Sequence, residues 1–159
     1  MKQAELARWL QWMVAVIALA GLAMCFLIAP ALGSDAARMN PEFKYMFWPC
    51  LVFIWISAVP FYLALWKTWQ ICGDISRDNS FSWKNAERLK FISKLALFDC
   101  LLYMAAAIVL FIMNLLHPSI LLMVLFIIVV GISIAAVSAV LSHLVEKAGA
   151  LRQENDLTI

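Results

Sequence analysis

Four long apolar segments dominate this chain, and they restrict it to folds whose surroundings are lipid. The segments cover residues 9–30, 46–66, 95–116 and 120–143. Each is about as long as the α-helix of roughly 20 residues that crosses the hydrocarbon core of a bilayer. A segment inside lipid must also pair its own backbone N–H and C=O groups, which an α-helix does. We therefore predict an all-α, polytopic membrane protein in which four transmembrane helices form a bundle.

The composition excludes a soluble globular fold. Hydrophobic residues make up 65% of the 159 residues and charged residues only 14%, against about 45–50% and about 25% in soluble domains. The four spans leave no length for a second folded unit, so we predict a single membrane domain over residues 1–159. The net charge of +2 provides no basic field for direct binding of nucleic acid.

Lysine and arginine are distributed unevenly between the two ends of the predicted spans. Ten of the twelve lie in the N-terminal flank, the loop 67–94 or the tail 144–159, and only Arg38 and Lys44 lie between spans one and two. Cytoplasmic segments of membrane proteins carry the excess of these residues. We therefore expect the loop, the tail and both termini in the cytoplasm.

Small residues at four-residue spacing predict where the helices meet. Span four carries Gly131, Ala135 and Ala139, and spans one and three have comparable small residues, which let membrane helices approach closely. We expect these three faces to meet inside the bundle. The alternative is a seam between two copies along span four, which would make the protein a homo-oligomer.

Asp99 is the one carboxylate inside a predicted span. An ionisable side chain in a span is a functional hypothesis by default. Because a short turn joins spans three and four, we expect Asp99 to contact His143 and to clasp the two helices together. The alternative is a proton or ion site at Asp99.

The sequence contains no catalytic constellation. Its two histidines, His117 and His143, are expected at opposite membrane faces, so they cannot share a metal. Its four cysteines are widely spaced without a CxxC pair, and no phosphate-binding glycine motif occurs. We therefore expect a non-enzymatic protein with no cofactor, metal or catalytic residue.

The loop between spans two and three has the pattern of a short amphipathic helix. Ser82 is a preferred N-cap residue, and Asn85 stands three positions later, where a capping box places Glu or Gln. Phe81 and Leu89 belong to the apolar stripe, whereas Arg88 is expected to stay in water. We predict a helix lying in the cytoplasmic interface before span three. The alternative is a docking platform for a cytoplasmic partner.

The C-terminal tail is the second distinctive cytoplasmic segment. The helix of span four can continue into it, and after Glu154 and Asp156 the chain ends in Leu157, Thr158 and Ile159. Threonine and isoleucine favour extended structure. Such an end could add a strand to a partner or fold back on the loop, although a frayed terminus is the usual alternative.

Loop and tail together resemble a family of small bacterial four-pass membrane proteins catalogued as a domain of unknown function. The resemblance lies in Phe81-Ser82-x-x-Asn85-x-x-x-Leu89-x-x-Ile92 after span two and Glu154-x-Asp156-Leu157-Thr158-Ile159 at the end. It implies a location in the bacterial cytoplasmic (inner) membrane. Members are often encoded beside small helix-turn-helix regulators of the phage-repressor type. The resemblance therefore implies that the loop and tail bind or sequester such a DNA-binding regulator.

Two other functions compete with this regulatory role. The first is a small transporter or channel that uses Asp99. The second is an accessory structural subunit of a larger membrane complex. The partners expected from the sequence are the lipid bilayer, a cytoplasmic DNA-binding regulator and, in a homo-oligomer, a second copy of the chain.

Overall fold

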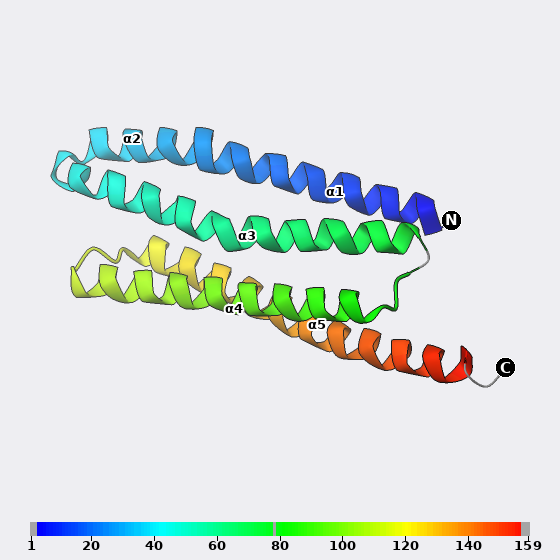
Figure 1. Ribbon diagram of the computed structural model, residues 1–159. Helices are drawn as coiled ribbons and strands as arrows, with labels where there is room; N and C mark the ends of the chain where they lie inside the picture. The colour runs from blue at the N-terminus through cyan, green and yellow to red at the C-terminus, as the bar shows by residue number, and fades with distance from the viewer. Residues whose placement is uncertain (1–2, 78, 157–159) are drawn as a thin grey trace.

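The computed structural model describes residues 3–77 and 79–156 and confirms an all-α fold (Figure 1). Its elements are α1 (Gln3–Ala23), the π-helical segment η1 (Met24–Ile28), α2 (Ala29–Met39), the 3₁₀ segment η2 (Pro41–Met46), α3 (Phe47–Ser76), α4 (Trp83–Ile112) and α5 (Pro118–Asp156). Four stretches are long and apolar enough to cross a membrane: Glu5–Met39, Lys44–Ser76, Trp83–Ile112 and Pro118–Arg152. The four predicted spans are therefore all present.

Successive spans run antiparallel, so the molecule has two distinct ends (Figure 1). The start of α1 and the end of α5 lie at the same side as the α3–α4 connection, and we call this side the termini end. The turns from α2 to α3 and from α4 to α5 lie at the opposite side, which we call the hairpin end.

The first span does not end at Pro30, so the predicted range 9–30 is too short at its C-terminal side. The helical path continues through η1 into α2 as far as Met39. In η1 the N–H of Ala29 bonds to the carbonyl of Met24, five residues back. In the same register residue 30 would bond to Cys25, but proline has no N–H. The indole Nε1 of Trp55 donates to that Cys25 carbonyl instead, at 3.2 Å, so α3 satisfies the group that proline frees.

The predicted polar loop 67–94 is mostly helical. α3 runs on to Ser76 and α4 begins at Trp83, which leaves a connection of residues 77–82. The prediction of a separate helix lying in the interface is also wrong, because α4 is uninterrupted from Trp83 to Ile112. The amphipathic residues form its first turns. Low hydropathy marks where a helix leaves lipid, and it does not mark where the helix ends.

Asn114 closes α4 at the hairpin end. Its φ of 56° is in the left-handed region, which asparagine adopts more readily than most residues. The N–H of Leu115 then reaches back to the carbonyl of Leu110 at 2.9 Å, as in the Schellman motif that ends many helices. Pro118 opens α5, where the absence of an N–H carries no cost.

The spans pack in chain order. α1 contacts α3, α3 contacts α4, and α4 contacts α5 most extensively. In the parts of the chain that the structure describes, the backbone of α1 does not approach α4 or α5. The expected meeting of spans three and four is therefore confirmed at Gly131 and Ala135, whereas the expectation that Ala139 belongs to the same face is wrong, because Ala139 is exposed. The expectation that span one joins them is wrong, because Ala18 and Gly21 of α1 face Tyr62 of α3.

Three side-chain donors join α4 to α5 through backbone carbonyls. Ser142 Oγ donates to Ala86 O at 2.8 Å. Ser93 Oγ donates to Ala135 O at 2.8 Å, and Cys100 Sγ donates to Ile128 O at 3.6 Å. The contacts recur every seven residues on both helices. A seven-residue repeat keeps the same face of each antiparallel helix against the other along their length, and we call this contact the seam. Gly131 lies in this seam, where a Cβ would overlap Cys100 Sγ.

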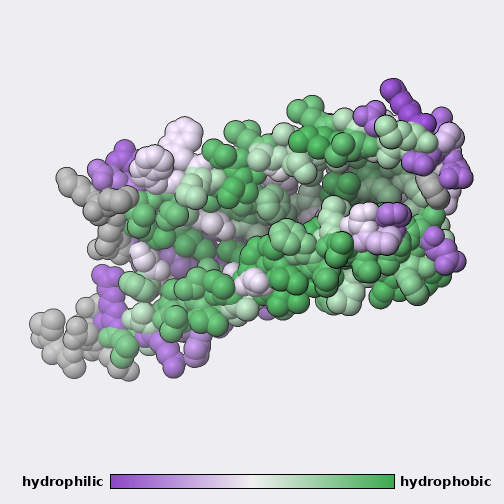
Figure 2. All heavy atoms as spheres, turned by 180° about the vertical axis from the view of Figure 1, so that it is seen from behind, coloured by the Kyte–Doolittle hydropathy of each residue, from purple (hydrophilic) through white to green (hydrophobic). Residues whose placement is uncertain are grey.

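The face shown in Figure 2 is mostly apolar between the two ends. Large side chains such as Leu19, Leu63, Leu101 and Phe126 are exposed in the middle of the spans, and the hydrophilic residues gather at the two ends. Small residues such as Ala135, Ser138 and Ser142 are buried instead. This inversion suits helices that meet through small residues and turn their large apolar side chains to lipid.

Candidate functional site

Asn85 organises the α3–α4 connection from inside. Only 1% of its surface is exposed. Its Nδ2 donates to the carbonyls of Asn79 at 3.1 Å and Ser80 at 3.3 Å, and its Oδ1 accepts from Arg88 Nη1 at 2.8 Å. Its backbone N–H donates to Ser82 Oγ at 3.3 Å, which confirms Ser82 as the N-cap of α4. One side chain therefore ties the connection to the first turn of α4.

Arg88 extends this network to the end of α3. Its Nη1 also donates to Asp74 Oδ2, forming an ion pair whose two side chains are mostly buried. The carbonyl of Asp74 accepts the N–H groups of Arg77 and Asn79. Hydrogen bonds with an ionised donor or acceptor are stronger than those between neutral groups. The network of Asp74, Asn85 and Arg88 thus fixes how α4 follows α3. We call it the connection lock.

The connection lock presents two aromatic side chains outward. Trp83 is 66% exposed and Phe81 is 53% exposed. Gly149 of α5 lies close enough to the Phe81 carbonyl that a Cβ there would sit 3.1 Å from it. The backbone that carries Phe81 is therefore held against α5 while its ring stays exposed.

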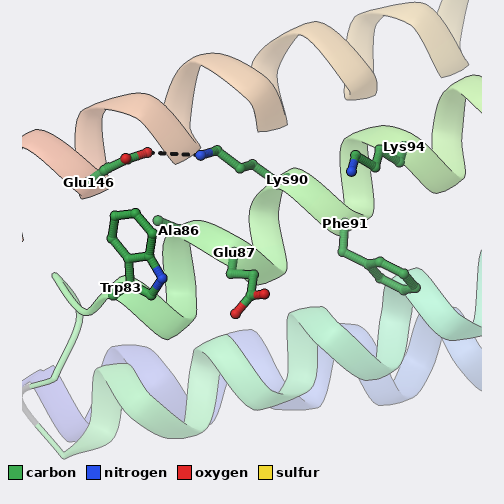
Figure 3. Close-up of a pocket in the computed structure, with 7 residues that line it drawn as sticks. All are labelled: Trp83, Ala86, Glu87, Lys90, Phe91, Lys94 and Glu146. Atoms are coloured by element: carbon green, nitrogen blue, oxygen red, sulfur yellow. Dashed lines mark hydrogen bonds and ion pairs between the residues drawn. The ribbon is translucent and has the colours of Figure 1, made fainter.

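A groove of about 290 Å³ opens beside Trp83 (Figure 3). It is lined by Trp83, Ala86, Glu87, Lys90, Phe91, Lys94 and Glu146. We call it the termini groove. Lys90 reaches from α4 to Glu146 on α5, with 3.0 Å between Nζ and Oε2, and Lys90 Nζ lies 5.8 Å from the Trp83 ring centroid. Phe91 points from α4 toward α3, where Lys67 Nζ lies 5.5 Å from its ring centroid.

The charges of the termini groove are mixed. Glu146 is paired with Lys90, and Glu87 and Lys94 are exposed at its rim. An exposed ion pair such as Lys90–Glu146 contributes only about 0–1 kcal/mol, so it can open for a ligand at small cost. The arrangement combines aromatic surface with charged groups of both signs, which suits binding to a protein surface.

The predicted site residues divide between the interior and the surface. Asn85 and Arg88 build the connection lock and are not offered to a partner, so the expectation that Arg88 stays in water is wrong. Leu89 is half-buried, and Phe81 is exposed. The backbone of Glu154 and Asp156 belongs to α5, but their side chains, and Leu157, Thr158 and Ile159, lie outside the described residues.

The predicted clasp between Asp99 and His143 is not formed, and that prediction is wrong. Ser142, the residue before His143, donates to the Ala86 carbonyl, so His143 lies near the level of Ala86. Asp99 lies 13 residues farther along α4, which is about 20 Å at 1.5 Å per residue. Asp99 Oδ1 is buried and has no hydrogen-bond partner. The prediction assumes that spans three and four have matching ends, whereas the contact of Ser142 with Ala86 sets another register.

Sequence reasoning missed the residues that line the termini groove. Trp83, Glu87, Lys90 and Lys94 follow one another at helical spacing and so share a face of α4. That spacing is the available signal, but the sequence does not show that this face of α4 lies beside Glu146 of α5. Among the described residues, no group of three or more His, Cys, Asp or Glu is placed to hold a metal ion.

The chain matches one family model and is similar to a membrane protein of Bacillus subtilis. The family model described as "Protein of unknown function (DUF2975)" matches residues 31–159. The "Uncharacterized membrane protein YoaS" of Bacillus subtilis (strain 168) is 29% identical over 140 residues, which cover 87% of this chain and 88% of that protein. No solved structure matches the chain. The family match includes the connection lock and the whole termini groove.

Proposed function

Because this chain belongs to the family of proteins of unknown function DUF2975, we propose a function from its own geometry. It is a non-enzymatic protein of the bacterial inner membrane that binds a cytoplasmic helix-turn-helix regulator at its termini end. The observation that carries the proposal is the rigid presentation of Phe81 and Trp83 beside the termini groove. The class of partner rests on the gene neighbourhood that the motif resemblance implies.

The charge distribution supports a cytoplasmic termini end. Among the described residues, every Lys and Arg except Arg38 and Lys44 lies in the half of the molecule nearer the termini end. Cytoplasmic flanks carry such an excess. This orientation presents the connection lock, the termini groove and the end of α5 to proteins in the cytoplasm.

Trp83 is the side chain best placed to anchor a partner. Exposed tryptophans at the centre of an interface are common energetic hot spots. Trp83 stands on a helix whose start is fixed by the buried Asn85, so little conformational freedom is lost on binding. The neighbouring Lys94 and Glu87 offer charges of both signs for orienting the partner.

We expect Trp83→Ala to weaken binding of the regulator encoded beside this protein by about tenfold or more. Truncating a hot-spot side chain costs roughly 2 kcal/mol of binding free energy. Trp48→Ala is the matched control, since Trp48 is 64% exposed but lies at the hairpin end. Affinity is measured between purified regulator and detergent-solubilised protein. Equal binding by the two variants would contradict the proposal.

A second pair of variants separates the tail from the groove. If the tail contributes, deleting residues 153–159 should weaken binding of the regulator. If only Trp83→Ala weakens that binding, the termini groove is the binding site. A stable detergent complex that contains no DNA-binding protein would favour the accessory-subunit role instead.

Asp99 favours a small transporter or channel as a second candidate function. Its buried Oδ1 has no hydrogen-bond partner, and it shares a helix face with Tyr103, whose hydroxyl lies 3.1 Å from Ser57 Oγ of α3. Unpaired carboxylates within spans often mark ion or proton pathways.

For this second candidate, liposomes carrying the protein should show proton or cation flux that Asp99→Asn reduces to the background of empty vesicles. The amide keeps the size of the side chain and removes its charge. Asp35→Asn is the control, because Asp35 is exposed at the hairpin end. Absence of flux in the unaltered protein, or equal flux in Asp99→Asn, removes this candidate.

A further inference from the structure

A second groove, of about 540 Å³, lies at the hairpin end. Its lining comes from α2, η2 and the first turn of α3: Ser34, Ala37, Arg38, Pro41, Lys44, Phe47 and Trp48. We call it the hairpin groove. Gly33 permits its shape, since a Cβ at that position would lie 2.9 Å from Phe47 Cε2. The absent side chain lets α2 lie close against the aromatic start of α3.

Both basic residues of the hairpin end line this one groove. Arg38 and Lys44 are the only Lys or Arg between Trp9 and Trp66, and each is exposed. Among the residues that the structure describes, no carboxylate forms an ion pair with Arg38 or Lys44.

The acidic residues of the same turn are kept out of the hairpin groove. Asp35 and Glu42 are close in sequence to Arg38 and Lys44, but they do not line it. The end as a whole is therefore nearly balanced in charge, while the groove itself is positive. A positively charged concave site with no internal counter-ion selects an anion.

The hairpin groove lies where the polar turn meets the apolar span. Trp48 forms part of its wall and is 64% exposed, as expected of a tryptophan at the level of lipid headgroups. Leu32 of α2 and Val52 of α3 are exposed nearby in sequence, on the apolar side of the turn. A ligand that fills the groove meets cations at one side and apolar surface at the other.

We propose that the hairpin groove binds the phosphate headgroup of an anionic phospholipid, with its acyl chains lying along α2 and α3. Arg38 supplies a planar guanidinium for two phosphate oxygens, and Lys44 supplies a second positive charge. A free phosphate ion would use only these cations, whereas a phospholipid also uses Trp48 and the apolar helix surface. The surrounding bilayer provides this ligand. The site is independent of partner binding at the termini end.

The test compares phosphatidylglycerol with phosphatidylcholine as ligands of the full-length protein in detergent, counted by native mass spectrometry. We expect Arg38→Gln and Lys44→Gln each to lower the preference for phosphatidylglycerol about fivefold, and the double variant roughly 25-fold. Lys84→Gln/Lys147→Gln removes the same charge from exposed positions at the termini end and should leave the preference unchanged. An unchanged preference in the hairpin double variant would overturn the proposal.

Two further measurements keep the result interpretable. If the double variant is not monodisperse, Arg38→Gln and Lys44→Gln alone test the proposal, because each changes only one exposed side chain. Inorganic phosphate is added as a competitor to the unaltered protein. Failure to displace phosphatidylglycerol supports a lipid site, whereas displacement at concentrations similar to those of the lipid shows a free-anion site and overturns the lipid assignment.

Discussion

Asn85→Ala is expected to lower the free energy of unfolding by about 3 kcal/mol, because several buried groups lose their partners together. The amide of Asn85 satisfies the carbonyls of Asn79 and Ser80 and accepts from Arg88. Alanine replaces none of these bonds. The guanidinium of Arg88 would keep only Asp74, so the start of α4 should loosen from the end of α3.

The measurement is SDS titration of the protein in mixed micelles, followed by circular dichroism. Asn79→Ala is the matched control, since the Asn79 side chain is exposed in the same connection and its backbone carbonyl is retained. We expect the control to differ from the unaltered protein by no more than about 0.5 kcal/mol. Similar losses for both variants would show that Asn85 is not the organising residue.

Gly131→Leu is the second substitution with a large expected effect, about 3 kcal/mol of destabilisation from overpacking. A Cβ at residue 131 would already overlap Cys100 Sγ, and a leucine would force α5 away from α4. The seam hydrogen bonds from Ser93 and Cys100 should then lengthen. The same SDS titration measures the loss.

Two further variants assign this loss to the α4–α5 seam. Ala139→Leu adds a large side chain on the exposed face of α5 and should be nearly neutral in lipid or detergent. Gly131→Ala should be destabilising alone but tolerated together with Cys100→Ala, which removes the overlapping sulfur. If Gly131→Ala is equally costly with and without Cys100→Ala, the clash is not the cause and the close approach of the helices is in doubt.

The number and order of the spans follow from hydropathy, but their ends do not. A window of apolar residues reports the part of a helix in lipid, whereas α3, α4 and α5 all continue beyond it. Pro30 shows the limit most clearly. Proline alone predicts a helix end, and only the tertiary contact from Trp55 to Cys25 makes continuation possible.

The candidate site was predictable in its position and only partly in its roles. Ser82 was correctly read as an N-cap because capping depends on adjacent residues. Asn85 is predicted at the capping-box position and as a partner contact, and Arg88 is predicted to stay in water, since helical periodicity cannot show that Asp74 lies across the connection. Asp99 and His143 were paired wrongly because the register between antiparallel helices depends on packing, here on Ser142 against Ala86.

The packing of each span against its chain neighbour has a consequence for biosynthesis. Among the spans in the described residues, α1 contacts α3, α3 also contacts α4, and α4 contacts α5. Each helix leaving the ribosome therefore finds its contact surface on the helix inserted just before it, and an earlier helix waits for one successor at most. Vectorial insertion, which proceeds from the N-terminus at roughly 5–20 residues per second, can build this molecule in the order in which it is translated.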